Sequence, residues 1–114
     1  MASQIKDLKE QDFKNAVSSG VAVVGFWAPW CHTCHAVMPL LDGISESMKD
    51  RASFFKVNVV ENPGLSSKYG VMSLPNILFF KENKVFDQII GSTNKQVIET
   101  KINKLLCGLP QSIP

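Results

Sequence analysis

Residues 26–34 read Phe-Trp-Ala-Pro-Trp-Cys-His-Thr-Cys, and this stretch decides the fold and the chemistry that the chain predicts. Cys31 and Cys34 have the spacing at which two side chains meet when the second residue lies in the first turn of a helix. Two such thiols can close on each other and open again, which is the chemistry of a Cys-X-X-Cys pair. A reversible dithiol/disulfide couple is therefore the leading prediction.

Hydrophobic patterning predicts a buried strand before the cysteines and a helix after them. Residues 21–27 form an almost wholly apolar run, which is typical of a strand covered on both faces in an α/β sheet. Cys34 joins the apolar stripe of the following helix, whereas Cys31 and His35 fall together on another side of it. The pattern predicts an exposed nucleophile, Cys31, and a sheltered resolving partner, Cys34. The stripe consists of Val37, Leu40, Leu41, Ile44 and Met48.

The position of Cys31 at the start of a helix favours its thiolate. Unpaired backbone N–H groups point outward from the first turn, where negative charge is stabilised. His32 adjoins Cys31 and His35 follows one helical turn later, so either imidazole, when protonated, favours the thiolate and makes the disulfide easier to reduce. We therefore interpret His32, Thr33 and His35 as residues that tune the couple. The alternative is that both histidines are solvated and exert little influence.

The remaining elements follow from periodicity, capping and turn residues. An Asn62-Pro63 pair favours a helix start, and Asn83 suits a left-handed turn position. The last helix is expected to bury Ile98, Ile102, Leu105 and Leu106 and to stop at Gly108. The predicted elements are a helix over 8–17, a strand over 52–59, a helix from 62 to 69, a hairpin of strands 76–81 and 85–90 turning at 82–84, and a final helix opening with a capping box at 93–96.

The order of these motifs resembles the thioredoxin family along nearly the whole chain. The resemblance implies an α/β fold of the thioredoxin type, with a central mixed β-sheet flanked by helices on both faces. It also implies a protein-disulfide oxidoreductase that mainly reduces its substrates, with a more oxidising enzyme or an isomerase of the same fold as the alternative. Beyond residues 26–34, the likeness rests on Lys56-Val57-Asn58-Val59, Asn62-Pro63, Lys68-Tyr69-Gly70-Val71, Ser73-Leu74-Pro75 and Gly91.

The resemblance also assigns a substrate-binding surface around the cysteine pair. Pro75 stands where the family has a cis-proline facing the disulfide, and X-Pro bonds are those that adopt the cis form readily. An apolar rim with exposed backbone suits recognition of many partner proteins by shape. Trp30, Val59, Met72 and Leu74 could equally be ordinary core residues. For Trp27, which is expected to pack beneath them, a core position is the better interpretation. The predicted substrate-binding residues are Trp30, Val59, Met72, Leu74, Pro75 and Gly91.

Four positions at or near the cysteine pair depart from the family pattern. Six residues before the first cysteine, thioredoxins typically hold a buried aspartate that serves proton transfer with the resolving thiol, and this chain has Gly25. His32-Thr33 replaces the usual Gly-Pro between the cysteines, and His35 replaces a common lysine. The general base for Cys34 is therefore open, with water or His35 as candidates.

Length and charge restrict the remaining function classes. A chain of 114 residues fits a single domain, 1–114, with a short tail at 109–114. The net charge of +2 comes from scattered lysines, which argues against nucleic-acid binding. No leader or membrane-length apolar run is seen, so we expect a cytoplasmic protein, monomeric, without membrane contact or bound cofactor. Expected partners are protein disulfides and a thioredoxin reductase or another thiol electron donor.

Other uses of the cysteine pair remain open. Residues 31–35 also fit C-x-x-C-H, the attachment motif of c-type haem. Two thiolates and two histidines could bind zinc or copper, and two chains could share an iron–sulfur cluster, although a second cysteine pair is missing. A redox-inert interaction domain is a further alternative. Cys107 is expected to be a buried spectator, with an intermolecular disulfide or modification as the alternative.

Overall fold

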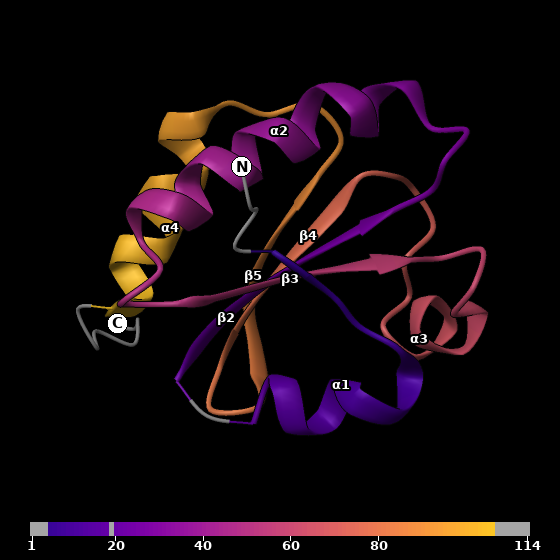
Figure 1. Cartoon of the computed structure of the whole chain (residues 1–114), viewed down its shortest axis with the longest axis horizontal. Coiled ribbons are helices and arrows are strands. Elements are labelled where there is room, and N and C mark those ends of the chain that lie inside the picture. Colours follow the sequence, from indigo (N-terminus) through magenta and orange to yellow (C-terminus); the bar gives the residue numbers. More distant parts are fainter. Residues whose placement is uncertain (1–4, 19, 107–114) are drawn as a thin grey trace.

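A computed structural model describes residues 5–18 and 20–106 of the chain. Its sheet has five strands in the order β1-β3-β2-β4-β5, with α2 and α4 on one face and α1 and α3 on the other (Figure 1). This arrangement confirms the predicted α/β fold with helices on both faces. The elements are β1 (Lys6–Asp7), α1 (Glu10–Ala16), β2 (Val21–Trp27), α2 (His32–Ser47), β3 (Ser53–Asn58), α3 (Pro63–Lys68), β4 (Asn76–Lys81), β5 (Lys84–Ile90) and α4 (Lys95–Leu106).

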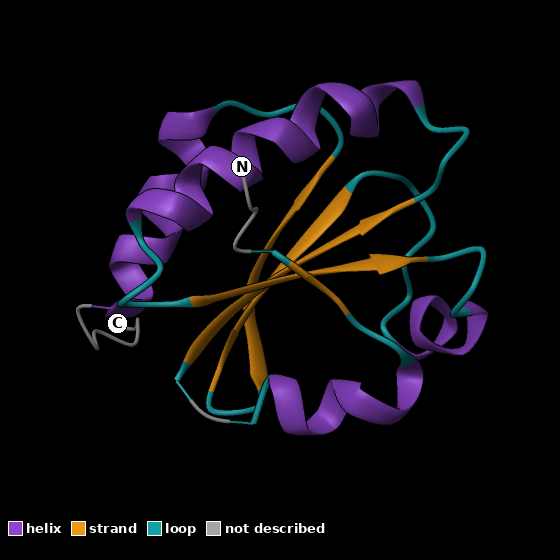
Figure 2. Ribbon diagram, viewed as in Figure 1, coloured by secondary structure: helices purple, strands orange, loops and turns teal. Residues whose placement is uncertain are grey.

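The sheet is mixed, as predicted, and β2 lies at its centre (Figure 2). Strand β2 runs parallel to β3 and antiparallel to β4, which pairs with β5 in the predicted hairpin. Residues 21–26 of β2 are all buried, because helices cover both faces of this strand. The polar strand β1 was not predicted. Its two residues carry no hydrophobic alternation, and only their pairing with Phe55 and Lys56 of β3 defines them as a strand.

The side chains of β2 point alternately to the two faces of the sheet and so contribute to two layers of the core. Val21 and Val23 pack with the apolar stripe of α2 and with Ile98 and Ile102 of α4. Val24 and other side chains of opposite orientation pack with α1 and α3 on the other face. Because side chains of a strand point alternately to the two faces, one apolar run supplies both layers. Strand β2, which leads into the cysteine pair, is thereby packed on both faces.

Asn62 has a different role from the predicted one. It does precede α3, with Pro63 in the first position, but its side chain makes no capping bond to α3. Asn62 Oδ1 accepts a hydrogen bond from the backbone N–H of Glu10 at 3.2 Å, and Nδ2 donates to the Asn58 carbonyl at 3.1 Å. With 4% of its surface exposed, Asn62 is a buried link between the start of α1 and the segment that follows β3.

Asn62→Ala should lower the free energy of unfolding by about 1–2 kcal/mol, because it removes the side-chain oxygen that accepts from the Glu10 N–H at the start of α1 and the Nδ2 donor to the Asn58 carbonyl. Urea denaturation measures the change. Asn103→Ala, an exposed substitution in α4, is the matched control and should change stability by less than about 0.5 kcal/mol. Equal stability of the two variants would show that Asn62 does not link these segments.

The hairpin turn uses the predicted residue, whereas the cap of α4 lies one residue after its predicted position. Asn83 takes the expected left-handed conformation with φ 74°, and Glu82 also has a positive φ, 51°, so two residues make the hairpin turn. Helix α4 is capped by Asn94, whose Oδ1 accepts from Val97 N–H at 3.0 Å, and not by Thr93. Helix α1 begins after Leu8, whose N–H donates to the carbonyl of Lys56 at 2.9 Å. The predicted stop at Gly108, Cys107 and the tail at 109–114 lie outside the described residues.

Candidate active site

The two cysteines lie where β2 leads into α2, and they form a disulfide. Cys31 directly precedes α2 and Cys34 is in its first turn, with 5.3 Å between their Cα atoms. Cys31 Sγ accepts a hydrogen bond from the backbone N–H of Cys34 at 3.1 Å. The sulfur of Cys31 therefore caps the helix, at the end where N–H groups and the helix dipole stabilise a thiolate.

The sulfur environments differ less in exposure than the helix pattern predicts. Cys31 is 7% exposed and Cys34 is 1% exposed, so the expected exposed nucleophile is largely covered in the disulfide form. The order of the two is as predicted, with Cys34 the more sheltered. Ala28 and the cysteines form a small apolar cluster that Trp27, Val59 and Leu74 cover from neighbouring segments, which explains the low exposure of Cys31.

An apolar rim opens beside Cys31. It surrounds a pocket of about 280 Å³ and includes Trp30, 70% exposed, and Met72, 93% exposed. Large side chains this exposed are typical of contact surfaces when they gather in one patch. Four of the six predicted substrate-binding residues meet here, and Ser66 and Val71 join them without having been predicted as site residues. The residues of the rim are Trp30, Cys31, Val59, Ser66, Val71, Met72 and Leu74.

Pro75 and Gly91, the other two predicted substrate-binding residues, are linked to each other through the backbone. The peptide bond between Leu74 and Pro75 is cis, as the resemblance implies. Gly91 N–H donates to the carbonyl of Pro75 at 2.8 Å, and its φ of 85° is a conformation that favours glycine. Neither residue lines the pocket at the apolar rim. Gly91 therefore holds the segment that carries Pro75.

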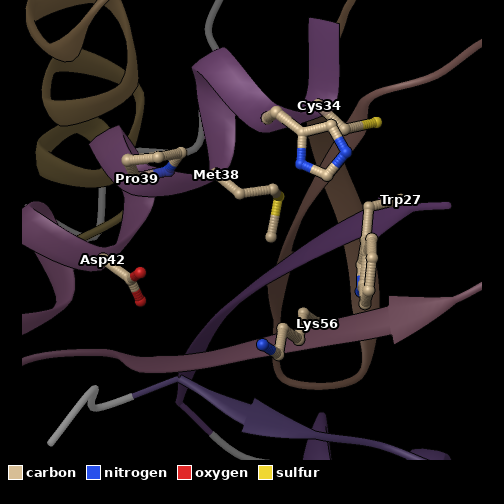
Figure 3. A pocket seen from close by; sticks show the side chains of 7 residues that line it. Trp27, Cys34, Met38, Pro39, Asp42 and Lys56 are labelled. Carbon is tan, nitrogen blue, oxygen red and sulfur yellow. The ribbon is translucent and has the colours of Figure 1, made fainter. Parts of the chain in front are cut away.

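A second pocket, of about 210 Å³, is lined by Cys34 and not by Cys31 (Figure 3). We call it the Cys34 pocket. Lys56 projects into it from β3, with Nζ 5.7 Å from the ring centroid of Trp27, and Asp42 lies at its far end (Figure 3). The residues of the Cys34 pocket are Trp27, Cys34, His35, Met38, Pro39, Asp42 and Lys56.

His35 belongs to the Cys34 pocket, although the helical spacing grouped it with Cys31. The reason is a hydrogen bond of 2.9 Å between His35 Nε2 and the carbonyl oxygen of Pro29, which draws the ring back over the start of α2. His35 is not among the residues of the apolar rim. Of the two residues between the cysteines in the sequence, His32 is exposed and Thr33 is half-buried.

Gly25 lies directly under α2, and Met38 fills the space beside it. A Cβ atom at position 25 would lie 3.1 Å from Met38 Cε and 3.2 Å from Leu41 Cδ2, both closer than ordinary contacts. Gly25 pairs with Lys56 of β3, so side chains at these two positions point to the same face of the sheet. The thioether of Met38 thus packs where a side chain from position 25 would enter the region below Cys34.

Within residues 5–18 and 20–106, no group of three or more histidine, cysteine, aspartate and glutamate side chains is arranged to hold a metal ion. Among the helices described, none combines the length and apolarity needed to cross a membrane.

Comparison with known proteins agrees with the geometry. The family model described as Thioredoxin matches residues 4–104. A thioredoxin of Bacillus subtilis is 36% identical over 97 residues, which cover 85% of this chain and 93% of that protein. A thioredoxin of Staphylococcus aureus is 34% identical over 102 residues, covering 90% and 98%.

A solved structure leads to the same assignment. The crystal structure of a thioredoxin from Malassezia sympodialis superimposes with a TM-score of 0.82 at 27% identity, covering 92% of this chain and 93% of that one. The fold, the Cys31–Cys34 disulfide at a helix start and these similarities have one explanation. The chain belongs to the thioredoxin family and is a thiol–disulfide oxidoreductase that acts on protein disulfides.

Proposed function

We propose that this protein reduces disulfides of client proteins, with Cys31 as the attacking residue and Cys34 as the resolving residue. The observation that carries the proposal is the Cys31 sulfur at the start of α2, hydrogen-bonded to the Cys34 N–H and bordered by the apolar rim. That position favours a thiolate and faces the surface that a client would contact. Cys34 is buried beside it and is bonded to Cys31.

The reaction has two exchange steps. Cys31 thiolate attacks one sulfur of the client disulfide, forming a mixed disulfide and releasing the other client sulfur as a thiolate. Cys34, after losing its proton, attacks Cys31 Sγ; the Cys31–Cys34 disulfide forms and the second client thiolate leaves. Two electrons pass to the client. A thioredoxin reductase or another thiol electron donor then reduces the Cys31–Cys34 disulfide again.

The direction of electron flow is tested by the reduction potential of the couple. Equilibration with glutathione mixtures, followed by quantification of free thiols, measures it. We expect a value between the potentials of thioredoxin, about −270 mV, and protein disulfide isomerase, about −180 mV. A value near that of a strong oxidant, about −120 mV, would assign the protein to the alternative, an oxidising enzyme of the same fold.

The apolar rim is proposed to bind clients through Trp30, Val59, Met72 and Leu74, while Pro75 and Gly91 shape the adjoining backbone. Trp30→Ala should raise KM for a protein disulfide about tenfold, because exposed tryptophans at contact surfaces often dominate binding. KM for a small aromatic disulfide should stay within about twofold. Phe86→Ala removes another exposed aromatic, from β5 outside the rim, and is the matched control. An equal KM rise in both variants would remove the rim from client binding.

His32 and Thr33 are proposed to make the Cys31–Cys34 couple more oxidising than a Gly-Pro pair between the cysteines would. His35 and Gly25 are also proposed to influence its reduction potential. Replacing His32→Gly together with Thr33→Pro should lower the potential by about 30 mV, because the reduced thiolate loses a neighbouring imidazolium. The potential of His35→Lys, measured separately by the same glutathione equilibrium, shows how much of the effect comes from His35 and how much from His32 and Thr33. A shift below about 10 mV in both variants would show that the histidines do not set the potential.

We also propose that residues 1–114 act as a single monomeric domain in the cytoplasm. The Cα radius of gyration of 13.1 Å agrees with one compact domain of about this length. A cytoplasmic location suits an enzyme whose cysteines must be kept reduced by a thiol donor. Size-exclusion chromatography with and without reductant tests the monomer, and a disulfide-linked dimer that Cys107→Ser abolishes would contradict it under oxidising conditions.

A further inference from the structure

The Cys34 pocket bears on how the resolving thiol loses its proton. Cys34 is 1% exposed, so bulk water has little access to its sulfur, and burial disfavours the thiolate that the second exchange step needs. Gly25 offers no carboxylate, and Met38 packs in the space beside it. Three charged or titratable side chains face the pocket: His35 and Asp42 from α2, and Lys56 from β3.

We propose that His35 accepts the proton of Cys34 through solvent in this pocket. The Pro29 carbonyl can only accept a hydrogen bond, so the hydrogen bond at 2.9 Å requires a proton on His35 Nε2. In the neutral ring this leaves Nδ1 with its lone pair, which makes it the basic atom. Histidine is the side chain that most often serves as a general base.

The other two groups are less suited to this step. Asp42 lies eight residues after Cys34 on α2, about 12 Å along the helix axis, with Met38 between them (Figure 3). Lys56 has no acceptor in its charged form, and its ammonium group lies over the Trp27 ring. A cation in the pocket favours the Cys34 thiolate once it has formed. His35 is adjacent to Cys34 in the chain and lines the same pocket.

The proposed proton transfer rests on the proposed function, in which Cys34 resolves the mixed disulfide. The proton on Cys34 Sγ passes through water to His35 Nδ1, giving an imidazolium. The Cys34 thiolate attacks Cys31 Sγ, the Cys31–Cys34 bond forms, and the bond between Cys31 and the client sulfur breaks. The departing client thiolate takes a proton from solvent, and the imidazolium returns its proton to solvent.

Stopped-flow kinetics with dithiobis-nitrobenzoate, an aromatic disulfide, separate the two exchange steps. An equimolar mixture with the reduced protein, in a Cys107→Ser background, releases one coloured thiolate on attack by Cys31. A second is released on resolution by Cys34. His35→Gln keeps an N–H donor for the Pro29 carbonyl and removes the base. The second phase should slow about tenfold near neutral pH, the first phase should stay within about twofold, and the difference should vanish as hydroxide takes over at high pH.

Two further variants sharpen the test. Added imidazole should accelerate the second phase of His35→Ala far more than that of the unsubstituted protein, because it restores the missing base. Asp42→Asn should leave the second phase within about twofold. An unaltered second phase in His35→Gln, a larger loss in Asp42→Asn, or no response of His35→Ala to imidazole would each overturn the assignment of His35.

Failure of this inference can be distinguished from failure of the proposed function. Cys34→Ser should lose the second phase entirely if Cys34 resolves. A second phase that survives in Cys34→Ser overturns the cysteine roles and, with them, the role of His35. A second phase that needs Cys34 but not His35 overturns only the proton transfer.

Discussion

Cys31→Ser should lower the rate of insulin disulfide reduction by at least about a thousandfold, whereas Cys34→Ser should form mixed disulfides that accumulate. The reason is the division of roles: of the two active-site cysteines, Cys31 belongs to the apolar rim, whereas Cys34 is buried and bonded to Cys31. Turbidity of precipitating insulin chains measures the rate. Non-reducing gels of the Cys34→Ser protein, incubated with disulfide-containing clients, detect the trapped complexes.

Both variants belong in a Cys107→Ser background, so that the third thiol neither forms nor resolves a complex. Cys107→Ser alone is the control and should reduce insulin at the rate of the unsubstituted protein. Trapping by Cys31→Ser with none by Cys34→Ser would reverse the roles. Full reduction activity in either active-site variant would contradict a dithiol mechanism altogether.

Gly25→Asp should lower the free energy of unfolding by about 2–4 kcal/mol at neutral pH. Its side chain must displace Met38 Cε and Leu41 Cδ2, which lie 3.1 and 3.2 Å from the Cβ position, and it places a carboxylate in a buried region. Urea denaturation measures the loss. The unfolded chain would release this proton at lower pH than the folded chain, so the deficit should grow as pH rises and shrink in acid.

Two controls separate packing from charge. Gly25→Ala adds only the Cβ atom, and Met38 lies beside the Cys34 pocket and can shift, so we expect a change below about 1 kcal/mol. Combining Gly25→Asp with Met38→Ala should cost less than the sum of the two single changes by about 1 kcal/mol or more. Strict additivity would mean that Met38 does not compete with side chains at position 25.

Much of the fold was predictable because local patterns report burial. The apolar run of β2, the stripe of α2 and the hairpin of β4 and β5 are each expressed within a few consecutive turns or residues, and all three are confirmed. Two of the errors concern contacts between distant segments. Asn62 has the sequence of a local helix cap, yet its side chain bonds to Glu10, 52 positions away, and strand β1 exists only through its pairing with β3.

The sequence by itself determined the redox pair, its place at a helix start and the thioredoxin order of motifs, because each depends on spacing along the chain. The tertiary structure alone decided which side chains surround each sulfur. It brought Val71 and Ser66 to the rim beside Cys31, seated Met38 against Gly25, and turned His35 toward the Pro29 carbonyl and the Cys34 pocket. These contacts depend on how α2 packs on the sheet and how the loop before it folds back, and helical periodicity specifies neither.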